Sequence, residues 1–217
     1  MNLLHSILNL IYPPKCPFCG RILEKGEEGL CFRCQRTLPW TTGINEPVDF
    51  CDVSLSPLRY QNSVREAVHR YKFRYGRMHS HLLGTLMVQC LHDRWSEPVD
   101  VIVWVPLSRK HRRKRGYDQA ELLARRVGEL AGIPVAAALE KIRDTETQSL
   151  LEKPAQRRAN VLGAYGMRDG MELDGKRVVL VDDVVTSGAT LAECASCLRM
   201  AGAESVVALT LACARKK

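Results

Sequence analysis

The sequence lacks the features that mark membrane and disordered proteins. No run of about 18 apolar residues occurs, so no segment is expected to span a bilayer as a helix. There is no internal repeat or low-complexity segment, and a hydrophobic content of 46% supplies ample material for a core, which excludes a disordered tail. A folded chain of 217 residues buries roughly 70% of its unfolded surface, enough for one substantial domain and a small appendage.

The N-terminus lacks both a basic leader and a small-residue cleavage site. Leucine and isoleucine recur at helical spacing over residues 1–12, and Pro13 and Pro14 end that pattern. We therefore expect a short helix rather than a signal peptide, which packs on the protein's own body or, alternatively, lies on a membrane surface. The polar face of this helix has no Lys or Arg, which favours packing on the body. The chain is expected to be cytoplasmic, without stable membrane insertion.

Acidic residues are in the minority, and the positive excess is local. Lys and Arg number 32 against 24 Asp and Glu, which gives a formal net charge of +8. Six of these cations lie within residues 109–115, and without them the formal charge falls from +8 to +2. The sequence thus predicts one strongly basic loop on an otherwise nearly neutral surface.

Cysteine is abundant for a chain without a secretion signal, and nine thiols indicate metal binding or free cysteines rather than disulfides. Four of them form two CxxC pairs, Cys16 with Cys19 and Cys31 with Cys34. A tight turn at each pair can bring both thiolates to one point, and eleven residues between the pairs leave room for a hairpin. Four thiolates close a tetrahedral Zn²⁺ site with no position for water, so we expect a structural zinc module. The doubled spacing disfavours the alternative of four unrelated buried thiols.

Helices and buried strands alternate over most of the chain. The expected elements are helices over residues 79–95, 120–130 and 189–201 and strands over residues 99–107, 178–181 and 206–209. The strands are continuous apolar runs without polar alternation, which is typical of a sheet covered on both faces. Such strands joined by helices predict an α/β fold with a parallel sheet.

A composition change separates the zinc module from this body. Residues 40–56 contain Pro, Gly, Thr and Asp without sustained periodicity and are expected to form a linker. We therefore predict two domains: residues 1–56, with the N-terminal helix, the zinc module and the linker, and residues 57–217, with the α/β body.

The chemistry-bearing residues gather where the strand at 178–181 ends. Asp182 and Asp183 follow it, then a loop of hydroxyl-bearing residues and glycine at 186–190, and then a helix. Ligands bind at the carboxyl ends of strands in such sheets. The N–H groups and hydroxyls of the loop, with the positive end of the helix, suit a phosphate, whereas two carboxylates suit the hydroxyls of a sugar diol or a divalent cation. A sugar phosphate with vicinal hydroxyls satisfies both halves.

Two other interpretations of this segment are weaker. Its spacing matches neither GxxxxGK[ST] nor GxGxxG, so a P-loop NTPase or a dinucleotide-binding fold is not supported. In isolation, Asp182 and Asp183 could cap a solvated strand end, and TSGAT could be an ordinary helix cap.

The order of apolar strand, acidic pair and TSGAT resembles the phosphoribosyl diphosphate (PRPP) motif of type I phosphoribosyltransferases. The resemblance implies that Asp182 and Asp183 bind the ribose hydroxyls of PRPP. It also implies that the loop binds the 5′-phosphate; its residues are Thr186, Ser187, Gly188, Ala189 and Thr190.

Further segments make the whole chain similar to the ComF family of phosphoribosyltransferase-like proteins. They are the four-cysteine module, YKFRYGR at 71–77, VWVPL at 103–107, RKRGYDQAELLA at 113–124, and TETQSLL with RRANVLGAY within 145–165. The resemblance implies a type I phosphoribosyltransferase-like fold with an N-terminal zinc-ribbon-like module, Mg²⁺-dependent PRPP chemistry, and an association with natural competence for DNA uptake.

The same resemblance extends to basic residues. It places Arg115 in the pocket, as a catalytic residue beside the acidic pair, and Lys72 among the PRPP-binding residues. No role follows for Gln148, Arg157, Arg158 and Asn160, although they stand in a similar segment.

One departure from the family pattern concerns charge. Asp118 stands where the RG[FY]NQ pattern has Asn. A further carboxylate beside a diphosphate would repel it, unless Mg²⁺ or Arg115 intervenes.

The basic segment at 109–115 leaves two functions open. As a mobile loop it would stabilise the leaving diphosphate of a PRPP-dependent phosphoribosyltransferase, a pentosyl transferase whose acceptor the sequence does not identify. As a phosphate-binding surface it would hold single-stranded DNA in a non-enzymatic competence protein with a regulatory or vestigial PRPP pocket, acting with DNA-uptake proteins. A solvated basic loop without a ligand is the plain alternative.

Overall fold

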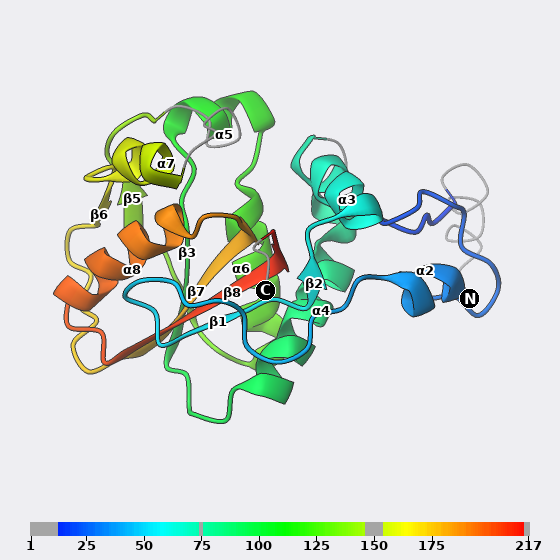
Figure 1. Ribbon diagram of the computed structural model, residues 1–217, viewed down its shortest axis with the longest axis horizontal. Coiled ribbons are helices and arrows are strands. Elements are labelled where there is room, and N and C mark those ends of the chain that lie inside the picture. The colour runs from blue at the N-terminus through cyan, green and yellow to red at the C-terminus, as the bar shows by residue number, and fades with distance from the viewer. Residues whose placement is uncertain (1–12, 74–75, 146–153, 215–217) are drawn as a thin grey trace.

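A six-stranded parallel sheet organises the chain in the computed structural model, which describes residues 13–73, 76–145 and 154–214 (Figure 1). The strands are β1 (Val53–Leu55), β2 (Leu58–Arg59), β3 (Val101–Trp104), β4 (Val135–Ala136), β7 (Arg177–Val185) and β8 (Ser205–Cys213). Their order is β1-β8-β7-β3-β4, and β2 also pairs with β8. The long central strands β7 and β8 are almost wholly buried, which explains their unbroken apolar runs.

Helices cover both faces of the sheet, because alternate side chains of each strand point to opposite faces. On one face, Val179 and Val181 pack with α3 (Asn62–Phe73), α4 (Gly76–Arg94) and α6 (Gln119–Ala131). On the other face, Val178 and Leu180 pack with α8 (Ala189–Met200). The predicted α/β fold with a parallel sheet between helical layers is confirmed.

A second, two-stranded sheet lies on the α8 side. It pairs β5 (Leu139–Lys141) antiparallel with β6 (Tyr165–Met167), and α7 (Pro154–Val161) packs beside it on α8. Leu139 and Tyr165 join the core on this face. In Figure 1 this small sheet lies at the left of the view, near α7 and α8.

Some elements differ from the expected ones. Strand β7 continues through the acidic pair to Val185, so Asp182 and Asp183 lie within the strand rather than after it. Part of the expected linker, Val53–Leu55, is strand β1 on the edge of the sheet. The division of the chain after residue 56 stays a prediction, and the helix predicted at 1–12 lies outside the described residues.

The basic segment forms a helix, so the prediction of a loop is wrong. Helix α5 spans Arg109–Arg115, with the Ser108 hydroxyl accepting from the N–H of His111 at 3.4 Å. Gly116 ends the helix in the left-handed region, at φ 78°, and donates its N–H to the Arg112 carbonyl at 2.8 Å. The sequence did not indicate this helix, because the basic residues between the two caps show no apolar periodicity. Within the described ranges, no helix is both long and apolar enough to cross a membrane.

Gly128 provides a test of how α6 packs on the sheet. Alanine normally stabilises a helix interior relative to glycine by about 1 kcal/mol. A Cβ at position 128, however, would lie 2.3 Å from Val135 Cγ2 and 2.7 Å from the Ile133 carbonyl oxygen. We expect Gly128→Ala to lower the free energy of unfolding by about 1–3 kcal/mol, measured by urea denaturation. The exposed Glu129→Ala in the same helix should change it by less than about 0.5 kcal/mol; equal effects would contradict the packing.

Candidate functional site

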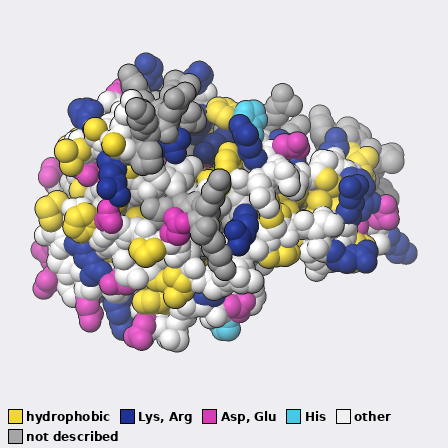
Figure 2. Space-filling view, in the orientation of Figure 1, with side chains coloured by type: hydrophobic (Ala, Val, Ile, Leu, Met, Phe, Trp, Pro, Cys, Tyr) yellow, Lys and Arg dark blue, Asp and Glu magenta, His cyan; other side chains and the backbone are white. Residues whose placement is uncertain are grey.

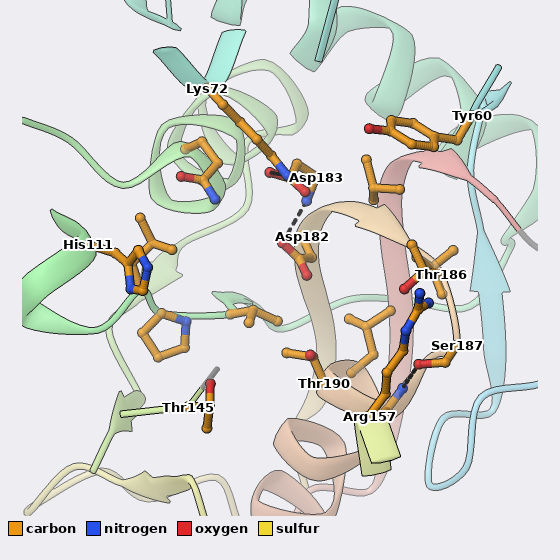
Figure 3. A pocket seen from close by; sticks show the side chains of 18 of the residues that line it. Tyr60, Lys72, His111, Thr145, Arg157, Asp182, Asp183, Thr186, Ser187 and Thr190 are labelled. Carbon is orange, nitrogen blue, oxygen red and sulfur yellow. Dashed lines mark hydrogen bonds and ion pairs between the residues drawn. The ribbon is translucent and has the colours of Figure 1, made fainter. Parts of the chain in front are cut away.

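A cavity of about 930 Å³ opens at the carboxyl ends of β3 and β7 (Figure 3). Its wall combines residues of α3, α5, β5, α7 and the turn from β7 to α8. Six Lys and Arg side chains line it against three carboxylates: Arg65, Arg70, Lys72, Arg115, Lys141 and Arg157 against Glu66, Asp182 and Asp183. This excess of cations suits a ligand with several negative charges.

The acidic pair divides between the two faces of β7. Asp183 shares its face with Val181, toward α3, whereas Asp182 shares its face with Leu180, toward α8. Both carboxylates nevertheless reach the cavity at the end of the strand (Figure 3). The two acids, adjacent in sequence, therefore meet different neighbours and have different local charges.

Asp183 forms an ion pair with Lys72. The Lys72 Nζ lies 3.0 Å from Asp183 Oδ2, and the carboxylate is only 4% exposed. Burial opposes the charge on Lys72, but the adjacent Asp183 outweighs it, so the pKa of Lys72 is raised. The pair therefore keeps Lys72 charged and compensates one carboxylate at the base of the cavity.

Among the described residues, no Lys or Arg forms an ion pair with Asp182, and the charge of Lys72 lowers the pKa of that carboxyl group less than burial raises it. Its Oδ1 accepts the N–H of Asp183 at 2.7 Å. Burial, and then the charge of Asp183, raise the pKa of Asp182 above its ordinary value. A carboxyl group with a raised pKa carries less negative charge, so it repels an anionic ligand less and still offers oxygen acceptors to hydroxyl groups.

The loop after β7 forms a cradle at the start of α8. All five expected residues line the cavity: Thr186, Ser187, Gly188, Ala189 and Thr190. Gly188 adopts φ 79°, in the left-handed region, and has no side chain to cap the helix, while the N–H of Ala189 donates to Ser187 Oγ at 3.4 Å. The first N–H groups of α8 therefore face the cavity together with hydroxyl groups, which is the arrangement that binds phosphate.

Arg115 lies at the cavity as expected, but most of α5 does not. The Arg115 Nη1 donates to Gln119 Oε1 at 2.7 Å, and its guanidinium carbon lies 5.1 Å from the Phe73 ring centroid. Of the other α5 residues, His111 also lines the cavity, whereas Arg112 pairs with Glu121 at 3.2 Å.

Asp118 is a structural residue. Its Oδ1 accepts from the N–H groups of Ala120 and Glu121 at 3.0 and 3.2 Å, which caps α6. Its Oδ2 accepts the N–H of Leu107 at 2.8 Å, and the residue is 3% exposed. The carboxylate points into backbone donors instead of lining the cavity, which weakens the repulsion expected toward a diphosphate.

Of the four residues left without a predicted role, three lie in the described part of the chain and have different positions. Arg157 lines the cavity near Thr186 and Ser187 (Figure 3), whereas Arg158 lies 3.6 Å from Asp49 in an ion pair. Asn160 offers its carbonyl to Arg143 at 3.1 Å. Gln148 lies outside the described residues. Only the packing of α7 beside α8 reveals the position of Arg157, since no local pattern in the sequence encodes it.

Lys141 is a further cavity residue that the sequence did not indicate. Its Nζ donates to Thr145 Oγ1 at 2.7 Å and lies 5.2 Å from the Tyr165 ring centroid. Burial lowers the pKa of Lys141. The antiparallel pairing of β5 with β6 brings it to the cavity, and the isolated strand signals were too short to predict that pairing.

The four expected cysteines form one metal site beside α3. Their sulfur atoms all lie within 4.8 Å of one another, and those of Cys19 and Cys31 are 3.7 Å apart. Zn–S bonds of about 2.3 Å in a tetrahedron place sulfurs about 3.8 Å apart, so the cluster fits one structural Zn²⁺.

Hydrogen bonds around the cluster favour the ionised form of one ligand, Cys31. Burial opposes ionisation of Cys31, but the N–H of Cys34 and the guanidinium of Arg21 outweigh it and lower the pKa of Cys31 to about 6. Glu27 accepts the N–H groups of Glu24 and Phe32, both at 2.8 Å, and so orders the segment between the two pairs. The thiolate form is thus favoured at Cys31, whereas burial raises the pKa of Cys34 and Cys19 in the absence of a metal charge.

Comparison with known proteins identifies the family. A phosphoribosyl transferase domain model matches residues 113–217, and a double zinc ribbon domain model matches residues 7–66. The DNA utilization protein YhgH of Escherichia coli is 32% identical over 88% of this chain and 80% of its own length. Competence protein ComFC of Bacillus subtilis is 27% identical over 90% of this chain and 76% of its own length. The chain belongs to the ComF family.

This ComF-family chain combines a phosphoribosyltransferase-like fold with a zinc ribbon, as predicted. The glutamine PRPP amidotransferase of B. subtilis is a similar solved structure, 28% identical, with a TM-score of 0.40 over 59% of this chain and 25% of that chain. The names of the relatives associate the ComF family with competence and DNA utilization.

The zinc site of this ComF protein can be tested by removing one ligand. Cys31→Ser should reduce the bound zinc from one ion per chain to nearly none, because three thiolates leave the tetrahedron open. Most core residues on the two faces of the parallel sheet lie outside the zinc module, so the circular dichroism of the sheet should persist. Cys51→Ser, outside the cluster, should keep full zinc content in metal analysis. Retention of zinc by Cys31→Ser would contradict the site.

Proposed function

We propose that this ComF-family protein binds PRPP with Mg²⁺ and transfers its phosphoribosyl group to an acceptor. The observation that carries the proposal is one cavity that combines a phosphate cradle at the start of α8 with two carboxylates on β7 and six cations. A simple phosphate ligand would leave the carboxylates without a role, and a simple sugar would leave the cradle empty. PRPP, a diol with phosphates at both ends, uses every part.

Each part of the cavity has a role toward this ligand. The N–H groups at Gly188 and Thr190 receive the 5′-phosphate, and Asp182 accepts hydrogen bonds from the ribose hydroxyls. Lys72 compensates Asp183 nearby, so the ribose end does not meet two bare carboxylates. Arg115 approaches from the α5 side, where it offers donors to the diphosphate.

Transfer breaks the bond between C1 of the ribose and the diphosphate oxygen. The electron pair leaves with the diphosphate, and a lone pair of an acceptor nitrogen forms the new bond to C1. Mg²⁺ supplies charge neutralisation on the leaving group when it is bound with PRPP. Arg115 adds positive charge on the same side, and Asp182 holds the ribose while C1 carries positive charge.

A matched pair of glycine variants tests the phosphate cradle. Gly188 and Gly170 have nearly the same backbone, at φ 79° and 74°, but only Gly188 lines the cavity. Alanine therefore introduces the same backbone strain at both positions. Gly188→Ala should weaken Mg²⁺-PRPP binding by tenfold or more in calorimetry, a change of about 1.4 kcal/mol, because it distorts the cradle. Gly170→Ala should keep the wild-type affinity.

Two results would contradict the proposed binding site. One is an absence of PRPP binding by the wild-type protein in the presence of Mg²⁺. The other is an equal affinity of the Gly188→Ala and Gly170→Ala variants. Release of diphosphate in the presence of a panel of nitrogen acceptors then distinguishes transfer from binding alone.

Binding of single-stranded DNA is a second candidate function. No residue of α5 is buried, so this helix presents a dense row of cations to solvent. Figure 2 shows further Lys and Arg side chains on the zinc module at the right of the view. The names of the relatives refer to DNA utilization and competence, which supports DNA as the polyanion that these surfaces contact.

The salt dependence of DNA binding tests this second function. Replacing Arg112, Arg113 and Lys114 by Gln should weaken binding to an oligothymidylate and flatten the plot of log affinity against log salt by about 0.7 for each lost phosphate contact. A control variant with Lys176→Gln and Arg168→Gln, which lie outside α5, should keep the wild-type slope. If both variants show the wild-type slope, α5 does not contact the DNA.

A further inference from the structure

Arg70 connects the zinc site directly to the cavity. From α3, its Nε and Nη2 donate to the Pro17 carbonyl at 3.2 and 2.9 Å, and Nη2 also donates to the Phe18 carbonyl at 2.6 Å. Both acceptors lie in the turn between Cys16 and Cys19. The same arginine lines the cavity, so a single side chain belongs to both sites.

The turn that Arg70 binds is shaped by the metal ligands. Cys16 accepts the N–H of Gly20 at 2.8 Å and donates to the Arg21 carbonyl at 2.8 Å, which folds the turn around the sulfur atoms. Phe18, at its centre, is fully buried in the main core. Small metal modules derive much of their folding free energy from the metal. The directions of the two carbonyls toward Arg70 thus depend on the loaded cysteine cluster.

The other side of α3 carries the ion pair of the cavity. Tyr71 is fully buried and donates its hydroxyl to the Gln119 carbonyl at 2.9 Å, which fixes the helix against α6. Lys72 follows directly and lies 3.0 Å from Asp183. Arg70 and Lys72 are two positions apart and leave the helix on different sides, one toward the zinc turn and one toward the acidic pair. Both side chains leave the last turn of α3, so a displacement of this turn at one of them also moves the other.

We propose that Arg70 is a positioning residue that couples the zinc site to the cavity by holding α3, and with it Lys72, in place against Asp183. This inference rests on the proposed binding of PRPP. Loss of zinc releases the Pro17 and Phe18 carbonyls from their fixed directions, and Arg70 then loses its acceptors. Lys72 is no longer held at Asp183, and the polyanionic ligand meets a carboxylate without its cation.

The coupling works in both directions, because linkage between two binding sites is reciprocal. If zinc strengthens PRPP binding by a given factor, PRPP strengthens zinc binding by the same factor. Couplings between sites commonly lie between about 5-fold and 150-fold. We expect about tenfold here, since one ion pair is displaced rather than the whole cavity.

The test measures zinc affinity of the full-length protein with and without ligand. Zinc is titrated from the protein by competition with a chromogenic chelator in excess Mg²⁺, in the absence and presence of saturating PRPP. In the wild type, PRPP should strengthen zinc binding about tenfold. In Arg70→Met, zinc should still bind, but PRPP should leave its affinity unchanged, and calorimetry should show PRPP binding weakened about tenfold.

Two control variants separate coupling from charge and from folding. Arg33→Met removes an exposed cation of α2 (Phe32–Thr37) in the zinc module, and it should behave as the wild type. Arg70→Lys keeps the charge with fewer donors, so it should restore part of the coupling. Circular dichroism should show the same fold for all variants.

Measurements on the wild type and on Arg70→Met can each overturn the inference. If PRPP binds but leaves the zinc affinity unchanged, the coupling is absent while the proposed function stands. If Arg70→Met retains the full effect of PRPP on zinc, the coupling does not pass through Arg70. If PRPP does not bind the wild type at all, the proposed function fails and the coupling fails with it.

Discussion

The ion pair between Lys72 and Asp183 is the contact on which the rest of the site depends. The Asp183 carboxylate lies almost out of solvent, where an unpaired charge would cost several kcal/mol. The ion pair also joins two layers of the fold, because Lys72 comes from α3 and Asp183 from the central strand β7. The cavity beside it takes its wall from α3, its floor from β7 and its phosphate cradle from the start of α8. The zinc module contacts the same helix through Arg70, so the structural metal and the cavity share one element.

This arrangement assigns a role to a zinc module on a phosphoribosyltransferase-like body. The body has an extensive core on both faces of the sheet. The module is too short for a core of its own and inserts Phe18 into the core of the body. In the proposed coupling, the contacts of Arg70 with the Pro17 and Phe18 carbonyls give the zinc module a role in supporting α3, the helix that carries Lys72.

The sequence predicted the features whose signals are local. Paired CxxC spacings predicted the metal ligands, and the order of strand, acidic pair and TSGAT predicted one cavity, because neighbouring residues create each of these sites. It did not predict the partners of the acidic pair, since strand alternation sends Asp182 and Asp183 to different faces and only tertiary packing selects Lys72. Helix α5 was missed because its stability comes from caps, whereas Arg157 and Lys141 reach the cavity through contacts between distant segments.

The most direct test of the account compares PRPP with its parts. Calorimetry on the zinc-loaded wild type with Mg²⁺ would measure PRPP, ribose 5-phosphate and inorganic diphosphate separately. The account predicts that PRPP binds one site more tightly than either part, and that ribose 5-phosphate and diphosphate each compete with it, because the cradle, the acidic pair and the cations lie in one cavity. Binding of PRPP no tighter than of diphosphate alone would contradict it, since the cavity would then be only a basic patch for polyanions.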